Sequence, residues 1–211
     1  MSPEVSGTIV VSGTGRVAVQ PDVADLRLGV AIARSTVAEA RAAAAAAMTA
    51  ILAAVETAGI ARPDVRTTLL SVQPRYDYRE AKPPTLAGYD LSNVVEVTVR
   101  DLSVLGAVVD GALSAGATSL DGLSFRLDDP AEAERVAHTA AVTEARARAE
   151  VLASAAGITI AGVTAIVEGG PSPIWPQPKA ARMMDSAGSS TPVEAGTTEI
   201  AVTVTITFRV G

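Results

Sequence analysis

Apolar and polar residues alternate with a period of two in several segments, which is the pattern of a β-strand with one buried face. The clearest alternation occurs within residues 26–32, 89–99 and 200–210. Weaker strand patterns occur at residues 8–19, 66–76, 120–127 and 160–168. In the last strand, 198–210, we expect one face to lie against the helices, namely Ile200, Val202, Val204, Ile206 and Phe208.

Three Ala-rich segments between these strands have their larger apolar residues at helical spacing and share one ending. They stop at Gly59, Gly116 and Gly157, each followed by an apolar residue. Glycine after the last turn is typical of a left-handed C-cap. The third segment opens with Asp129 as a predicted N-cap followed by a proline, and Asp101 is the predicted cap of the second.

The order of these elements is β-β-α-β-β-α-β-α-β-β, which predicts an α+β fold. We expect an antiparallel-rich sheet with the helices packed on one face. A chain of 211 residues suits one domain, 1–211, and one domain built of two similar halves is the alternative. The Pro-, Ser- and Gly-rich segment 169–196 is predicted to be a long loop between the last two strands.

Gly13 and Gly15 follow an apolar run, as the glycines of a phosphate-binding loop do. Such a loop needs its glycines at the start of a helix, where free backbone N–H groups meet the anion. Here an alternating segment and then Pro21 follow, so the chain continues as a strand. We therefore expect a β-bulge or kink at these glycines and no nucleotide site.

Charge and composition exclude several classes of function. A net charge of −6 disfavours nucleic acid, and the lack of cysteine excludes disulfides and thiol chemistry. The longest uncharged stretch, 42–55, is shorter than the roughly 20 residues of a membrane span, so none is expected. Met1 is followed by no leader-like pattern, so the expected location is the cytoplasm, or the periplasm or outside if a leader was removed.

Side chains that carry chemistry are few and scattered. His138 is the single histidine, so neither a Ser-His-Asp triad nor a two-histidine zinc site is indicated. The aspartates at 110, 121, 128 and 129 fit structural or solvated roles. No catalytic residue, cofactor or metal ion is predicted.

Two groups of residues are candidates for binding. In the predicted loop, apolar side chains are expected to dock on the domain or on a neighbouring subunit, so that the loop acts as an exchanged arm: Ile174, Trp175, Met183 and Met184. The candidate rim of a pocket between sheet and helices consists of Tyr76, Tyr89, Asp121 and His138.

Five segments of the sequence together resemble the SIMPL-domain family, formerly a domain of unknown function. They are "VVSGTGRVAVQPDVADLRLGV", "AGIARPDVRTTLLSVQPRYDY", "GYDLSNVVEVTVRDLSVLGAVVDGALSAGA", "LSFRLDD" and "TPVEAGTTEIAVTVTITFRV". The resemblance implies an α+β fold, frequent export to the bacterial envelope, a ring-like homo-oligomer in at least one similar protein, and a link to stress tolerance. It brings no agreed catalytic residues.

Two hypotheses of function follow. The first is a non-enzymatic module that self-assembles into a homo-oligomer and acts as a structural or interaction module, with an unknown protein partner. The second is a small-molecule-binding protein or weak enzyme with a pocket between sheet and helices.

Overall fold

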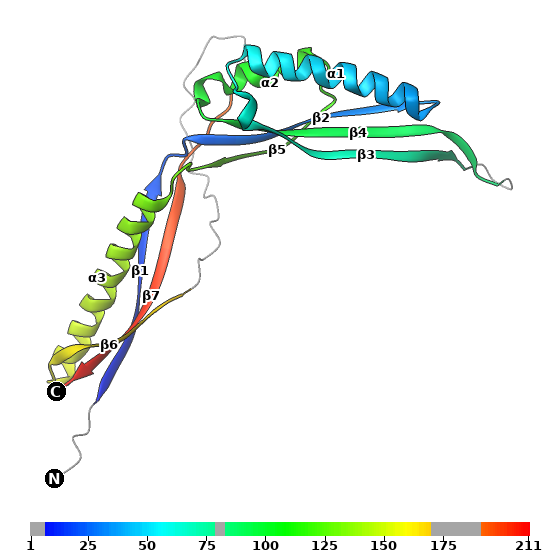
Figure 1. The fold of residues 1–211 in the computed structure, drawn as a ribbon. Helices are drawn as coiled ribbons and strands as arrows, with labels where there is room; N and C mark the ends of the chain where they lie inside the picture. Colours follow the sequence, from blue (N-terminus) through cyan, green and yellow to red (C-terminus); the bar gives the residue numbers. More distant parts are fainter. Residues whose placement is uncertain (1–6, 79–82, 170–190) are drawn as a thin grey trace. The chain divides into compact units, whose positions relative to one another are not determined.

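The computed structural model describes residues 7–78, 83–169 and 191–211, and the observed element order agrees with the predicted α+β order (Figure 1). The strands are β1 (Thr8–Val19), β2 (Val23–Arg34), β3 (Val65–Asp77), β4 (Thr85–Val99), β5 (Ser119–Arg126), β6 (Ile160–Glu168) and β7 (Thr198–Val210). The helices are α1 (Val37–Thr57), α2 (Leu105–Ser114) and α3 (Ala131–Ala156), with short 3-10 turns at Arg62–Asp64 and Leu102–Val104.

These strands form two antiparallel sheets, where the sequence had predicted one. One sheet has the order β1-β7-β6 and the other the order β3-β4-β2-β5. The chain accordingly divides into two compact units, one containing β1, α3, β6 and β7 and the other β2 to β5 with α1 and α2. Alternation shows which residues are buried in a strand, but it does not show which strands pair.

In the first unit, α3 packs on the three-stranded sheet through small side chains. Its buried residues recur at every fourth position: Ala137, Ala141, Ala145, Ala149 and Ala153. Opposite them lie the buried side chains of Val204, Ile206 and Phe208 from β7. The predicted inward face of the last strand is therefore confirmed, with Ile200 buried and Val202 partly buried at the edge of the core.

Gly13 and Gly15 lie in β1 where the backbone of α3 is very close to the strand. The pairing of β1 with β7 runs without interruption from Thr8 to Val19, so the predicted bulge is wrong. A Cβ atom on Gly15 would overlap the carbonyl oxygen of Ala137, and one on Gly13 would overlap that of Ala141. The two glycines let the backbone of the strand touch the backbone of the helix, which explains why small residues stand on both sides.

In the second unit, α1 and α2 cover one face of the four-stranded sheet (Figure 1). The core consists of alternate residues of the two central strands, together with apolar residues from both helices. From the strands these are Leu26, Leu28, Val30, Val95, Val97 and Val99. From the helices they include Met48, Ile51, Val55, Leu105 and Val108. Thr191 is tied to α2, because its N–H and hydroxyl donate to the Asp110 carboxylate at 3.0 and 2.6 Å.

The helix ends follow the predicted glycine signals. Gly59, Gly116 and Gly157 have φ of +94°, +104° and +67°, the left-handed region that glycine adopts without strain. Asp101 accepts a hydrogen bond from Ser103 N–H, but it caps the 3-10 turn Leu102–Val104 that leads into α2, and the N-cap position of α2 itself is Val104. The N-cap position of α3 is Pro130 and not Asp129, although the Asp129 carboxylate still accepts from Ala131 N–H at 2.9 Å.

By length and apolar composition alone, α1 is also a candidate membrane span, which the sequence did not predict. Core helices meet the same criteria. In this structure α1 packs against β2 and β4 through a buried stripe: Ala40, Ala44, Met48, Ile51 and Val55.

Candidate functional site

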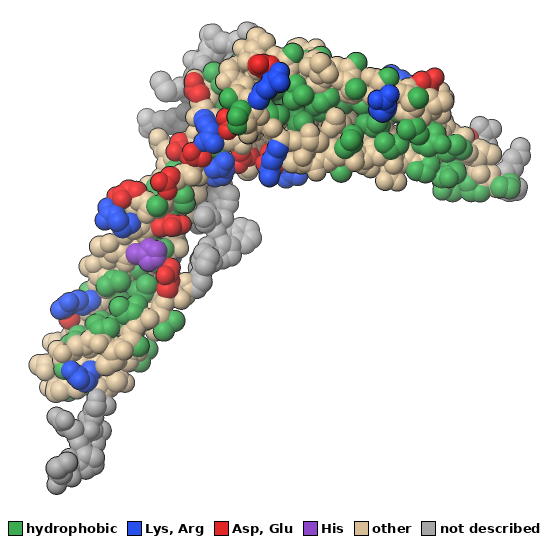
Figure 2. Space-filling model, in the orientation of Figure 1, with side chains coloured by type: hydrophobic (Ala, Val, Ile, Leu, Met, Phe, Trp, Pro, Cys, Tyr) green, Lys and Arg blue, Asp and Glu red, His purple; other side chains and the backbone are tan. Residues whose placement is uncertain are grey.

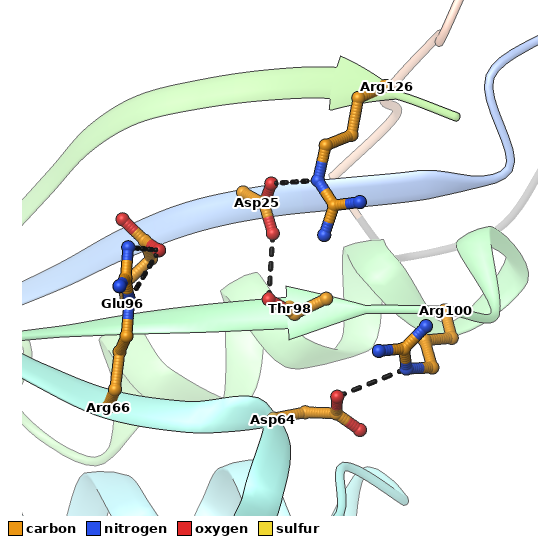
Figure 3. Close-up of polar contacts among 7 residues, drawn as sticks. All are labelled: Asp25, Asp64, Arg66, Glu96, Thr98, Arg100 and Arg126. Carbon is orange, nitrogen blue, oxygen red and sulfur yellow. Dashed lines mark hydrogen bonds and ion pairs between the residues drawn. The ribbon is translucent and has the colours of Figure 1, made fainter. Parts of the chain in front are cut away.

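The face of the four-stranded sheet opposite the helices bears a row of hydrogen-bonded charged side chains (Figure 3). Arg126 of β5 donates to Asp25 of β2 at 2.6 Å, and Thr98 of β4 donates to the other Asp25 oxygen at 2.7 Å. Arg66 of β3 donates twice to Glu96 of β4, at 2.9 and 2.6 Å. These five residues, the ion-pair row, link all four strands of the sheet.

The electrostatics of the ion-pair row favour the ionised form of Asp25. Partial burial works to raise the pKa of Asp25, but the hydrogen bonds from Arg126 and Thr98 outweigh it and leave the pKa below its ordinary value. A general acid at neutral pH needs the opposite shift. At the start of β3, Arg100 and Asp64 form a further ion pair at 3.1 Å. This arrangement supports a role in holding strands together.

Three of the four predicted rim residues lie in this unit, but at separate places. Tyr76 lies in β3 and Tyr89 in β4, at the outer end of their hairpin, where Tyr89 is opposite Arg34 of β2. Asp121 of β5 is opposite Arg27 of β2. The seven residue steps along β2 from Arg27 to Arg34 span about 23 Å at roughly 3.3 Å per step, so the tyrosines and Asp121 do not form one rim.

His138, the fourth predicted rim residue, lies on α3 in the other unit. Its Nδ1 is 2.7 Å from the carbonyl oxygen of Glu134, and its Nε2 is 2.9 Å from a carboxylate oxygen of Glu168 in β6. The hydrogen bond with Glu168, followed by that with the Glu134 carbonyl, raises the pKa of His138. Both ring nitrogens face acceptors, so only the imidazolium donates to both. The histidine links a helix to a strand.

The predicted interaction residues Ile174, Trp175, Met183 and Met184 lie outside the described residues. In the described part of the chain, no group of three or more His, Asp or Glu side chains is arranged to hold a metal ion.

An open pocket of about 410 Å³ lies beside α1, over the β3 side of the sheet. Apolar residues from α1, β3, β4 and the connection after α1 line it: Leu52, Ala53, Val55, Ile60, Val65 and Val95. Its polar lining comes from Thr49, Glu56, Arg62 and Thr67. None of the four predicted rim residues is among these side chains. In the sequence, the strand residues that line this pocket look like ordinary core positions, and its α1 residues look like part of an Ala-rich helix.

The β3–β4 hairpin is the other prominent surface of this unit. Large apolar side chains on it are exposed: Leu69, Leu70, Val72, Tyr76 and Leu86. Figure 2 shows apolar side chains gathered toward the outer end of this hairpin. The signal in the sequence is the pair Leu69-Leu70, which interrupts the alternation of β3 where its pairing with β4 shifts by one residue.

These features define an α+β protein of two antiparallel sheets, with an open pocket and an exposed apolar hairpin in one unit. A model of the SIMPL family, described as a protein of unknown function (DUF541), matches residues 9–208, so the chain belongs to the SIMPL family.

Named relatives extend over much of the chain. The 26 kDa periplasmic immunogenic protein of Brucella melitensis biotype 1 is 34% identical over 211 residues, covering 96% of this chain and 84% of the relative. The protein of the same name from Brucella abortus (strain S19) has the same identity and coverage. The uncharacterized protein YggE of Escherichia coli (strain K12) is 35% identical over 146 residues, covering 69% of this chain and 59% of YggE.

Proposed function

We propose that this chain is a periplasmic, non-enzymatic module that assembles into a homo-oligomer and acts as a structural or interaction module. The name of the Brucella relatives, periplasmic immunogenic protein, supports the periplasm, the second location that the sequence leaves open, and no relative named above supports the cytoplasm. A link to stress tolerance stays a prediction of the family resemblance. The surface of β3 supports assembly.

The observation that supports assembly is the open edge of β3. Among the described residues, this strand of 13 residues is at the end of its sheet and pairs with β4 alone. Leu69 and Leu70 are 47% and 68% exposed, on a strand whose residues are mostly exposed. A long apolar edge strand offers backbone N–H and C=O groups to another strand, and proteins that do not use such an edge cover or charge it.

The edge strands β1 and β3, one from each sheet, differ in this respect. On β1, the Glu144 carboxylate accepts from Thr14 N–H at 2.5 Å, and Arg148 donates to the Ser12 carbonyl oxygen at 3.0 Å. Side chains of α3 thus occupy backbone groups along the edge of β1. We assign the assembly contact to β3. A second copy presents the same edge, so the two β3 strands can pair antiparallel about a two-fold axis and satisfy the backbone groups of both copies. Pro74 lacks an N–H, so the proposed pairing segment precedes it.

Light scattering coupled to size exclusion tests this assignment over a range of protein concentrations. We expect wild-type protein to exceed the monomer mass, and Leu70→Lys to lower the mass without loss of helix signal in circular dichroism, because Leu70 is already exposed. Val10→Lys is the matched control, since Val10 is 60% exposed on β1, the edge strand whose backbone groups are hydrogen-bonded by side chains of α3. A monomeric wild type, or equal masses for Leu70→Lys and wild type, would contradict the assignment.

The exchanged arm predicted from the loop stays a separate prediction. Deleting residues 172–190 and measuring the mass in the same way tests it independently of β3.

A second candidate function, small-molecule binding, is supported by the pocket beside α1. It differs from the predicted pocket in its lining.

A further inference from the structure

The pocket beside α1 exists because the helix covers only part of its sheet. α1 packs on β2 and β4, whereas β3 continues the sheet beyond them. Val65 and Thr67 of β3 are opposite Val97 and Val95 of β4 and therefore share the face that bears the helices. The side of α1 above them has a small residue, Ala53, so a space remains between helix and strand.

The floor and walls of this pocket are apolar and partly pre-formed by the core. Val55, Val95 and Ile60 are 1%, 2% and 7% exposed, so they are fixed by packing and not by a ligand. The volume of about 410 Å³ falls in the usual range of small-ligand pockets, roughly 300–1,000 Å³. Such a lining takes an aliphatic chain and removes it from water.

The polar lining contains one charge of each sign. Glu56 and Arg62 approach to 3.8 Å, and their side chains are 61% and 88% exposed, so the pair is loose and its solvation is largely retained. A ligand group that carries one positive and one negative charge can replace this ion pair with two new ones, one to Glu56 and one to Arg62. A simple anion or cation meets one attractive and one repulsive side chain. The hydroxyl-bearing residues Thr49 and Thr67 also belong to the lining.

We propose that this pocket binds a single-chain amphiphile with a zwitterionic head group, its aliphatic chain against Val55, Val65 and Val95 and its head between Glu56 and Arg62. The site is separate from the proposed assembly contact at Leu70, which is not among the lining residues. Binding and assembly can therefore fail independently.

Fluorescence of N-phenyl-1-naphthylamine, an uncharged apolar probe, measures occupancy of the pocket. We expect saturable binding with one site per chain, and displacement by monomeric dodecylphosphocholine at a concentration at least about fivefold lower than dodecyl sulfate or dodecyltrimethylammonium requires. Absence of saturable binding, or displacement at equal concentrations by all three surfactants, would overturn the proposal.

Paired variants of α1 locate the site. Ala53→Phe adds a ring in the pocket at an exposed position and should weaken probe binding at least tenfold. Ala46→Phe makes the same change at an exposed α1 residue outside the lining and should stay within twofold of wild type. Thr67→Tyr blocks the pocket from the strand side and replaces Ala53→Phe if that variant does not fold. Equal binding by blocking and control variants refutes the location.

The charged pair has its own readout. Glu56→Gln should reduce the preference for dodecylphosphocholine over dodecyl sulfate, because it removes the side chain that repels an anion. The measurement is repeated in the Leu70→Lys background, where retained binding shows that the pocket acts without the β3 contact. An unchanged preference in Glu56→Gln contradicts the assignment of the head group.

Discussion

Replacing Gly15 with alanine tests how closely β1 and α3 approach. The new methyl group would overlap the Ala137 carbonyl oxygen and lie 2.7 Å from the Ala141 nitrogen. Both atoms belong to the helix backbone, so no side-chain rotation relieves the clash and α3 must move away from β1. Overpacking costs about 1–3 kcal/mol, and the immobile neighbours favour the upper end.

The unfolded chain partly offsets this cost. Alanine restricts the unfolded state more than glycine does, which returns about 0.4–1 kcal/mol. A net loss of about 2 kcal/mol remains, which corresponds to a fall in melting temperature of about 8–16 °C for a unit of this size. Circular dichroism at 222 nm measures the melting temperature, and hydrogen exchange of α3 peptides shows whether the loss is in the first unit.

The control is Gly162→Ala in β6, where an added Cβ has no atom within 4 Å and the backbone is not left-handed. It should melt within about 2 °C of wild type, since surface changes usually stay within about 0.5 kcal/mol. Trimming the helix with Ala137→Gly should not rescue Gly15→Ala, because the obstructing atom is a carbonyl oxygen. If Gly15→Ala melts with the control, the close approach of the two backbones is refuted.

Two further predictions concern the first unit. The pKa of His138 is raised in the folded state, so its contact with Glu168 stabilises the protein below the ordinary histidine pKa, and this stabilisation is lost as the pH rises through the raised pKa. Glu168→Gln should lower the pKa of His138, measured by NMR from the Hε1 resonance of this single histidine, and an unchanged pKa would exclude the contact. Val204 is 3% exposed, so Val204→Asp should unfold or aggregate the protein, because a buried unpaired charge costs several kcal/mol. The control is Val163→Asp, at a position that is 53% exposed. A soluble Val204→Asp variant with an unchanged melting temperature would contradict the place of Val204 in the core.

The sequence was sufficient for the element order because the signals involved are local. Alternation marks buried strand faces, and Gly59, Gly116 and Gly157 end their helices through backbone geometry that few other residues adopt. The division into two sheets was not predictable in the same way. The neighbours of β7 are β1 and β6, and β1 comes from the opposite end of the chain, so no local pattern specifies that pairing.

The candidate site was less predictable because it depends on which part of the sheet the helix α1 leaves uncovered. Tyr76, Tyr89 and Asp121 each lie on the predicted strands, but their separation is set by the register with β2. The pocket arises from the position of α1 over β2 and β4, with β3 left beside it. Its lining mixes core valines with residues of an Ala-rich helix, and neither kind is distinctive in a sequence.

The small residues of the first unit connect its stability with the protection of its edge. Gly13 and Gly15 allow α3 to lie against β1, and in this position Glu144 and Arg148 reach the Thr14 N–H and the Ser12 carbonyl. The hydrogen bond from Thr14 also lowers the pKa of Glu144, which keeps the acceptor charged. A larger residue at either glycine would therefore loosen the helix and uncover a strand edge at once. We expect the glycine variants to aggregate through β1 as they lose stability, whereas the edge of β3 stays available in the native fold for ordered assembly.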